Sequence, residues 1–366
     1  MSDAITGDEI PAWFDAMPAH ITVDLDAYAR NLDAIRTRVA PAEVMAVLKS
    51  DGYGHGLLPI ARAALGAGIT ALGALDIDTA LRLRDSGIGE EVLIFAWLLA
   101  PHDDLDAAVA AGIDLGVSSL DELNRAAAAA SVRTDGRRAR VHLKIDTGLH
   151  RNGVSPAQWP DVVERAVWLR DSVELVGIWT HIAEASDDED TDAITRFHSA
   201  VAVAQAVGAE PQLRHLAASA AAFFRADARL DLVRIGAFGY GISPGGGITP
   251  GELGLTPVMT LKATVFSVKD GVARVAIGSG DGLSSAAAGR VSLAVDGRRY
   301  PIVEVGLDWV GLADPDGLIE RGAEVTLFGA GEHGEATLQE WADATGTIGE
   351  EIVTRLSPDI RRRYLP

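Results

Sequence analysis

Lysine is rare in this chain, and one of its lysines stands in a setting that suits amine chemistry. The lysines are Lys49, Lys144, Lys262 and Lys269. Lys49 ends the apolar run Met45-Ala-Val-Leu-Lys49 and precedes the glycine-rich Ser50-Asp-Gly-Tyr-Gly-His-Gly56. Partial burial between a strand and such a loop lowers the pKa of an amine and favours imine formation. A solvent-facing lysine at a strand end is the alternative that this stretch alone leaves open.

Further polar residues follow other short apolar runs. They are Tyr53 with His55, Asp146 with Arg151, His181, Ser219 and Arg234. In a (β/α)8 barrel the reactive groups gather at the carboxyl ends of the strands, so such residues meet although they are far apart in the sequence. Taken singly, each has an ordinary alternative: a packed aromatic, a core histidine, a turn serine or a strand-end ion pair. We expect one polar site if the runs are strands of one barrel.

The apolar runs alternate with alanine-rich amphipathic stretches up to about Gly241. Helical spacing occurs at 57–67, 78–86, 120–130 and 159–170, and the runs cover 44–48, 71–75, 92–95, 115–117, 141–145, 175–179, 213–216 and 232–235. This alternation predicts an α/β fold with a (β/α)8 barrel of the TIM type.

The sequence pattern changes after the predicted barrel. Glycine and proline dominate residues 242–251, and alternating apolar runs separated by Asp-Gly turns follow at 260–268, 272–277 and 325–328. The alternation predicts a mainly antiparallel β domain. We therefore expect a barrel over residues 12–243 and a C-terminal β domain over residues 250–366.

Composition narrows the classes of partner. The chain has 366 residues, with 52 acidic against 32 basic residues and a net charge of −20, so its surface repels nucleic acid and anionic membranes. It has no cysteine, which excludes disulfides, thiolate nucleophiles and sulfur-ligated metals. Neither a leader nor a run of about 18 apolar residues is evident, so we expect a cytoplasmic location. No metal site is predicted.

The lysine segment closely resembles the lysine signature of the alanine racemase family, the fold-type III enzymes that use pyridoxal 5'-phosphate. That segment is Val47-Leu-Lys-Ser-Asp-Gly-Tyr-Gly-His-Gly56, and four later segments resemble family motifs in the family's order: 142–154, 180–183, 215–219 and 233–244. Weaker matches lie at 322–329 and 346–348. The resemblance implies a barrel that binds the cofactor, a β domain that completes the active site of the partner subunit, and a homodimer acting on an amino-acid substrate.

The resemblance also implies roles for single residues. Lys49 would form the Schiff base and carry a proton on one face of the substrate. Tyr53, Ser219 and backbone groups near Gly236 would hold the phosphate, and His181 would lie close to the ring. Arg234 would face the pyridine nitrogen, and because a guanidinium stays protonated it would make the ring a weaker electron sink, which suits reversible α-proton transfer.

Lys144 and Asp146 point to the same side of a predicted strand as His142, with Arg151 a loop away. A buried ionic cluster is one interpretation of this pattern. The resemblance implies another, in which Lys144 is carbamylated and orients Arg151, and Arg151 contacts the phenolic oxygen of the cofactor or the carboxylate of the substrate.

The sequence departs from the family on the substrate side. Relatives take a second base from a tyrosine, and here Gly278-Ser-Gly-Asp-Gly282 puts Ser279 in that position. An aliphatic hydroxyl is shorter and far less acidic than a phenol with a pKa of about 10. Relatives have a Met-Asp pair that helps to bind the substrate carboxylate, and this chain has Leu307-Asp308 at that position. Leu307 can still offer its backbone amide. Relatives bind the phosphate with an Asn-Ser pair, and this chain has Ala218-Ser219 there. Asp359 stands where relatives commonly have an arginine.

Three functions stay open. The first is an amino-acid racemase that interconverts L- and D-amino acids, with Lys49, Arg151, Ser279 and Asp308 as candidate catalytic residues and Ser279 or Asp281 relaying a proton on the second face. The second is another pyridoxal phosphate reaction, such as aldol cleavage or exchange by one base, in the space that a tyrosine would fill. The third is a cofactor-binding protein without catalysis.

Overall fold

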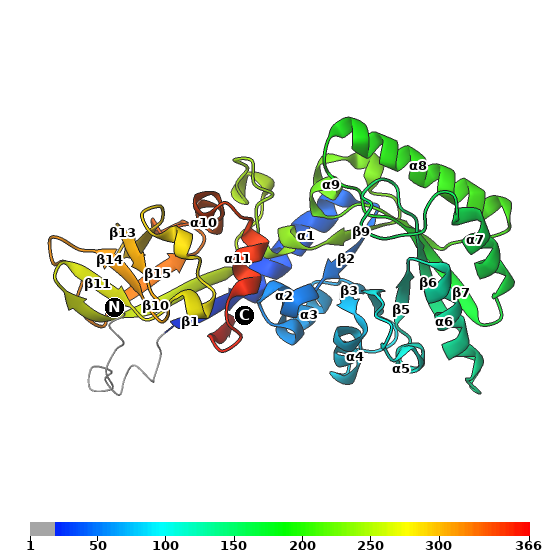
Figure 1. Cartoon of the computed structure of the whole chain (residues 1–366), viewed down its shortest axis with the longest axis horizontal. Coiled ribbons are helices and arrows are strands. Elements are labelled where there is room, and N and C mark those ends of the chain that lie inside the picture. The colour runs from blue at the N-terminus through cyan, green and yellow to red at the C-terminus, as the bar shows by residue number, and fades with distance from the viewer. Residues whose placement is uncertain (1–18) are drawn as a thin grey trace. The chain divides into compact units, whose positions relative to one another are not determined.

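A computed structural model describes residues 19–366 (Figure 1). Contacts divide these residues into two compact units, one formed by 32–52 and 61–236 and the other by 19–31, 53–60 and 237–366. Within the described residues no helix is both long and apolar enough to cross a membrane.

The first unit is a parallel barrel. Its strands are β2 (Glu43–Val47), β3 (Ala71–Asp76), β4 (Leu93–Leu98), β5 (Asp114–Val117), β6 (Ala139–Lys144), β7 (Val173–Trp179), β8 (Leu213–His215) and β9 (Leu232–Ile235), which pair in the order β8-β7-β6-β5-β4-β3-β2-β9. The backbone amides of Asp231 and Arg234 donate to the carbonyls of Arg214 and Ala217, so β8 and β9 close the ring. Every predicted run of the barrel overlaps one of these strands.

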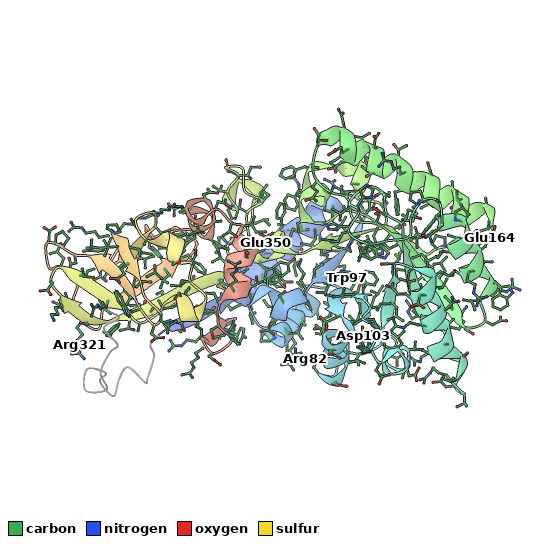
Figure 2. All side chains as sticks on the ribbon, in the orientation of Figure 1. Arg82, Trp97, Asp103, Glu164, Arg321 and Glu350 are labelled. Carbon is green, nitrogen blue, oxygen red and sulfur yellow. The ribbon has the colours of Figure 1, made fainter. Side chains whose placement is uncertain are left out.

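Helices follow the strands and cover the outside of the barrel (Figure 1). They are α3 (Leu57–Gly66), α4 (Ile77–Asp85), α5 (Leu105–Ala110), α6 (Leu120–Ser131), α7 (Trp159–Trp168), α8 (Asp187–Ala206) and α9 (Ser219–Phe224). Side chains such as Arg82 and Glu164 project from their outer faces (Figure 2). Asp76 and Ser119 cap α4 and α6 by accepting hydrogen bonds from Thr79 and Glu122, which fixes where each helix begins.

The interior of the barrel is apolar and aromatic in its middle layer. Its core residues are Met45, Ala71, Phe95, Trp179 and Leu232, and Trp97 of β4 packs against them. A buried hydrogen-bond network among β5, β6, β8 and β9 also lies inside this barrel.

The second unit contains an antiparallel barrel. Its strands are β10 (Met259–Lys269), β11 (Val272–Val275), β12 (Ser292–Val295), β13 (Arg298–Val305), β14 (Val310–Ala313) and β15 (Glu324–Phe328), and β11 pairs with β10 as well as β14, which closes the ring. The helices α10 (Leu338–Thr345) and α11 (Gly349–Arg355) belong to this unit. The fold class predicted from the sequence is confirmed.

The N-terminal strand of the described chain joins this second sheet. β1 (Ala19–Asp24) pairs antiparallel with β10 and parallel with β16 (Arg361–Leu365), and α1 (Leu25–Val39) follows it. The expected barrel range of 12–243 therefore includes a strand of the antiparallel sheet, and its residues 12–18 lie outside the described residues. Ile21 and Val23 have the alternation of a strand, but alternation does not say which sheet a strand joins.

Candidate active site

Lys49 begins an unusual turn at the carboxyl end of β2. It is the half-buried first residue of α2 (Lys49–Tyr53), in which Ser50, Asp51, Gly52 and Tyr53 have φ values of 54°, 54°, 61° and 52°. A left-handed conformation costs an L-residue roughly 1–2 kcal/mol, so a run of such residues stores strain. Strained backbone clusters at functional sites because the surrounding structure must hold it in place. The turn thus marks the position of Lys49 independently of its residue type.

The polar residues predicted for the other strands of the barrel meet at the same end. Lys144 ends β6, His181 follows β7, Ser219 follows β8, and Arg234 lies on β9. Arg234 Nη2 lies 3.1 Å from His181 Nδ1 and donates to the carbonyls of Thr180 (2.9 Å) and Leu216 (3.0 Å). The amide of Gly236 donates to Ser219 Oγ at 3.0 Å.

His181 reports how much positive charge gathers there. Burial, followed by Arg234, Arg151, Lys144 and Lys49, lowers the pKa of His181 to about 3. The ring is therefore neutral at physiological pH, and its Nδ1 accepts from Arg234 because a guanidinium only donates. Four basic side chains from four loops or strands act on one imidazole, in a protein whose net charge is −20. Such a site attracts phosphate and carboxylate groups.

Lys144 is held away from its predicted ionic partner. Its ammonium donates to Asn152 Oδ1 and lies 4.5 Å from the centre of the Trp179 ring. Asp146 accepts instead from the amides of Gly148 and His150, at 3.1 Å each. Burial, together with Arg234 and Arg151, lowers the pKa of Lys144 to about 7. A substantial fraction of this amine is neutral at physiological pH, unlike an ordinary lysine.

Tyr53 belongs to the second unit, where it is buried against aromatic neighbours. Its ring centre lies 4.8 Å from that of Tyr240, and the carbonyl of Tyr53 lies 2.8 Å from His55 Nδ1. Burial and, to a smaller degree, Glu350 raise the pKa of Tyr53. The phenol therefore keeps its proton and can donate a hydrogen bond to an anion.

The predicted substrate-side residues also lie in the second unit. Ser279 is exposed at the start of the short helix η4 (Ser279–Asp281), and its hydroxyl donates to the carbonyl of Gly306 at 3.1 Å. A Cβ on Gly278 would lie 2.2 Å from the carbonyl oxygen of Leu307, so the segments that carry Ser279 and Leu307 are in close contact. Leu307 and Asp308 are exposed.

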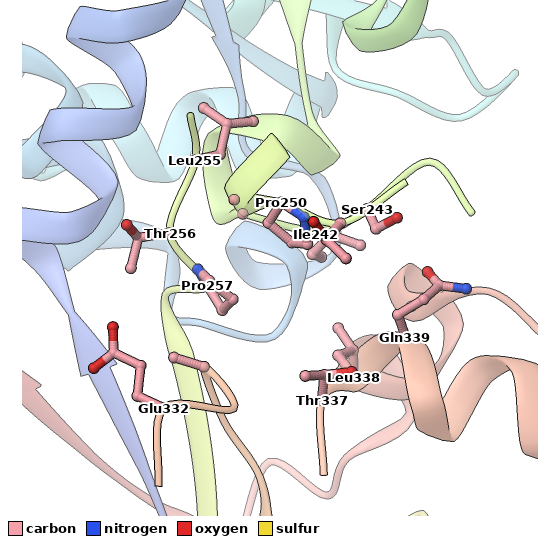
Figure 3. A pocket seen from close by; sticks show the side chains of 15 residues that line it. Ile242, Ser243, Pro250, Leu255, Thr256, Pro257, Glu332, Thr337, Leu338 and Gln339 are labelled. Atoms are coloured by element: carbon pink, nitrogen blue, oxygen red, sulfur yellow. The ribbon is translucent and has the colours of Figure 1, made fainter. Parts of the chain in front are cut away.

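A cavity of about 360 Å³ also lies in the second unit (Figure 3). It is lined by residues 241–243, 249–251 and 255–257, by Ala330, Glu332 and residues 337–339, and by Gly349. None of the predicted site residues lines it, and its walls are mostly apolar side chains and backbone. The chemistry is therefore assigned to the end of the parallel barrel.

Comparison with known proteins decides the family. Residues 23–244 match the N-terminal domain of alanine racemase, and residues 261–364 match its C-terminal domain. The chain belongs to the alanine racemase family. An alanine racemase of Thermobifida fusca (strain YX) is 41% identical to it and covers 94% of this chain and 98% of its own length. One of Mycobacterium tuberculosis (strain CDC 1551 / Oshkosh) is 39% identical and covers 94% of this chain and 96% of its own length.

Solved structures of alanine racemases superimpose closely. The alanine racemase from D-cycloserine producing Streptomyces lavendulae has a TM-score of 0.91 and 36% identity over 96% of this chain and 97% of its own. The enzyme from Bartonella henselae with covalently bound pyridoxal phosphate has a TM-score of 0.84 and 25% identity over 95% of this chain and 99% of its own. The predicted family and the predicted class of enzyme, an isomerase of the amino-acid racemase type, are confirmed.

Two polar residues of this alanine racemase family member were missed by the sequence reasoning. Asn152 accepts from Lys144, and Asp114 lies at the start of β5 in a buried hydrogen-bond network that reaches Arg234. Asn152 lies next to Arg151 in the segment 142–154 that resembles a family motif. Its position in a loop after a predicted strand was the only sequence feature that could have indicated a role. Asp114 lies at the amino end of its strand. Functional residues were expected only at the carboxyl ends of the barrel strands, so the sequence reasoning did not consider it.

Proposed function

We propose that the chain is a pyridoxal-phosphate-dependent amino-acid racemase that carries its cofactor on Lys49. The observation that carries this proposal is the set of four basic side chains, Lys49, Lys144, Arg151 and Arg234, that act on a neutral His181. The donors suit the group: a phenol at Tyr53, a hydroxyl at Ser219 and an amide at Gly236 for the phosphate, and a guanidinium for the ring nitrogen. When bound, pyridoxal phosphate supplies a conjugated ring that delocalises the electron pair left by the α-proton.

The residues of the chain then have distinct tasks. The Lys49 amine takes the α-proton on one face of the substrate and returns it there. Arg151 would bind the substrate carboxylate, and the family resemblance implies that the backbone amide of Leu307, in a segment oriented by Asp308, completes this contact from the β domain of a partner subunit. Burial lowers the pKa of Arg234 to about 9, and Glu184 offsets part of that shift, so the guanidinium is still protonated at neutral pH. Arg234 would donate to the ring nitrogen of the cofactor without protonating it, which would limit electron withdrawal and favour reversible proton transfer.

Ser279 favours a second candidate function, exchange or cleavage by one base. Two-sided proton transfer needs an acceptor on each face. The Ser279 hydroxyl donates to the carbonyl of Gly306, and an aliphatic hydroxyl is a weak acid and a weak base. A racemase of this kind would relay the second proton through water held by Ser279 or Asp281. A cofactor-binding protein without catalysis is the third candidate.

One experiment separates the three functions. Purified, cofactor-loaded protein is incubated with a panel of L- and D-amino acids in heavy water, and α-deuterium uptake and enantiomer ratio are measured. Deuterium uptake with inversion is the result expected for the racemase. Uptake with retained configuration, or aldehyde release from β-hydroxy amino acids, would establish one-base chemistry, and no reaction would favour the binding protein.

The cofactor assignment has its own control. Lys49→Ala should abolish covalent attachment of the cofactor, measured by mass spectrometry after borohydride reduction. Lys262→Ala is the matched variant, because Lys262 is ion-paired with Glu324 on the antiparallel sheet and should leave attachment unchanged. Attachment that survives in Lys49→Ala would overturn the assignment.

We further propose a cytoplasmic homodimer. The family resemblance supports the homodimer, since closed twofold assembly is the commonest form of soluble oligomers. Sedimentation equilibrium and cell fractionation test the two parts separately.

A further inference from the structure

A chain of hydrogen-bonded side chains runs inside the parallel barrel from Asp114 to Arg234. Asp114 Oδ2 lies 2.9 Å from His142 Nε2, and His142 Nδ1 lies 2.9 Å from His215 Nε2. His215 Nδ1 lies 3.0 Å from Arg234 Nη1. The four residues come from β5, β6, β8 and β9, and none is more than 4% exposed. Because no other element supplies these contacts, the barrel interior itself connects the two charges.

The packing around the two imidazoles fixes their positions. Gly177 of β7 leaves room for His142, since a Cβ there would lie 2.4 Å from His142 Nδ1. The Trp179 ring stacks on His215 at 5.7 Å with an interplanar angle of 9°, and Phe95 packs on His142 at 4.8 Å. The rings are therefore enclosed, and their hydrogen bonds cannot be exchanged for bonds to water.

Asp114 and Arg234, the two ends of this series of hydrogen bonds, determine which ring nitrogens of His142 and His215 carry a proton. A guanidinium only donates, so His215 Nδ1 must accept and His215 Nε2 must carry the hydrogen. His142 Nδ1 then accepts, and His142 Nε2 carries the hydrogen that Asp114 accepts. An extra proton on either imidazole would set two N–H groups against each other. Burial and Arg234 likewise lower the pKa of His215 well below its ordinary value.

Asp114 is held as an anion at the far end of the chain. Arg140, its neighbour across β5 and β6, donates from Nε at 2.6 Å and from Nη2 at 3.2 Å. Burial alone would raise the pKa of Asp114, but hydrogen bonds from His142 and Arg140 outweigh it, and the net direction is down. The Arg140 side chain is 34% exposed, so this series of hydrogen bonds begins near solvent at the amino end of the barrel. It ends at Arg234 in the candidate active site.

We propose that Asp114 is a positioning residue for Arg234, acting through the fixed tautomers of His142 and His215. The Asp114 carboxylate, which only accepts, and the Arg234 guanidinium, which only donates, together set the direction of all three hydrogen bonds, so that Arg234 Nη1 finds an acceptor. Nη1 and Nη2 are thereby occupied, and within residues 19–366 the Nε–H makes no hydrogen bond, which leaves it for the ring nitrogen. This last step rests on the proposed function, whereas the fixed tautomers do not.

The tautomers can be measured directly. In protein labelled with nitrogen-15 histidine, NMR should find His142 and His215 neutral, each with its proton on Nε2. A proton on Nδ1 of either ring, or a doubly protonated ring, in the unaltered protein would overturn the proposal. This measurement needs no catalysis, so it stands even if the proposed function fails.

Asp114→Asn tests whether the direction comes from the carboxylate. Arg140 needs an acceptor, so the amide should turn its oxygen to Arg140 and its NH2 to His142, which reverses both tautomers and sets an N–H of His215 against Arg234. We expect the visible spectrum of the bound cofactor to change, and α-proton exchange to fall about tenfold or more, as for other residues that orient a binding group. Unchanged tautomers and spectrum in a folded Asp114→Asn protein would overturn the proposal.

Two further variants separate positioning from loss of stability. Arg138→Gln removes a charge at the same end of the barrel, where Arg138 pairs with Glu174, and should leave the spectrum unchanged. In a His142→Leu background, Asp114→Asn should have no further effect on the spectrum, because the route between Asp114 and Arg234 is already cut. A full additional effect in that background would contradict action through His142.

Discussion

Ser279 decides how a proton can reach the second face of the substrate. Its side chain is exposed, so a larger residue can be accommodated there without entering the core. Ser279→Tyr would supply a phenol, which can both donate and accept a proton near its pKa of about 10. We expect the ratio of inversion to α-deuterium exchange to rise roughly a hundredfold, the lower end of the typical contribution of a positioned acid or base.

The control for this prediction is Ser279→Phe, which has the ring without the hydroxyl. Both variants are compared with the unaltered protein in heavy water by chiral chromatography and mass spectrometry. Equal inversion ratios for the tyrosine and phenylalanine variants would show that the position does not serve the second face.

Lys144 has the properties of an amine that can react with carbon dioxide. Burial, Arg234 and Arg151 lower its pKa to about 7, so the reactive neutral form accumulates as the pH rises through 7. The nitrogen attacks carbon dioxide and releases one proton, leaving a carbamate anion that would compensate Arg151 and Arg234. At a fixed pressure of labelled carbon dioxide, we expect a carbamate carbon-13 signal that grows from pH 6 to pH 8. Lys144→Gln should lack the signal, and Lys269→Gln should keep it.

At the level of elements, Gly54, which follows the left-handed turn, is closely packed by the C-terminal elements of its own unit. Gly54 has φ 75°, its carbonyl accepts from Arg362 Nε at 2.7 Å, and a Cβ on it would lie 2.4 Å from the carbonyl oxygen of Val353. The backbone of α11 thus leaves room for glycine alone at position 54.

Gly54→Ala should therefore disturb Tyr53. We expect a loss of about 1–3 kcal/mol in the free energy of unfolding, from the strained φ and the clash, and weaker cofactor binding. Denaturant unfolding and titration with pyridoxal phosphate measure the two effects. Gly66→Ala is the matched control, because Gly66 ends α3, has no atom within 4 Å of its would-be Cβ, and should be neutral or stabilising. Equal behaviour of the two variants would contradict this account.

The sequence predicts elements better than it predicts their partners. The barrel strands were identifiable because strands buried on both faces read as continuous apolar runs. The pairing of β1 with β10 was not, since it joins residues more than 230 positions apart and local alternation carries no information about sheet membership. The left-handed turn was also hidden, because Ser50, Asp51 and Tyr53 are not glycine.

The site shows the same division. Lys49, His181, Ser219 and Arg234 are strand-end residues that a barrel must bring to one end, whatever its details. Asp114 and the tautomers of His142 and His215 depend on side-chain directions inside a closed ring. The roles of Asp114 and of these tautomers can be inferred only when the strand register that places Asp114 beside Arg140 is known.

At the scale of the whole molecule, charge is distributed unevenly. The chain carries a net charge of −20, yet Lys49, Lys144, Arg151 and Arg234 all act on His181 at the end of the barrel. Anionic groups are therefore attracted to this end of the barrel, although the chain as a whole is acidic. The acidic surface therefore favours small anionic ligands over extended polyanions, which fits an amino-acid substrate and a phosphorylated cofactor.

The resemblance to alanine racemases implies that the β domain of one subunit completes the site of its partner, and this can be tested with hybrid dimers. Lys49→Ala and Asp308→Ala should each be inactive alone in α-proton exchange. If Lys49 and Asp308 of different subunits share a site, every hybrid dimer holds one doubly altered site and one intact site. An equal mixture, unfolded and refolded together, should then recover about a quarter of the unaltered activity, since half of the dimers are hybrids with one intact site of two.

Lys49→Ala mixed with Arg151→Ala is the matched control for subunit sharing. Both residues lie in the parallel barrel of the same chain, so a hybrid of these variants has one alteration in each site and stays inactive. Recovery in the first mixture and not in the second would mean that catalysis requires the dimer. Recovery in neither, with hybrids verified by mass spectrometry, would place Asp308 in the site of its own subunit, and the β domain would then serve the barrel to which it is covalently joined.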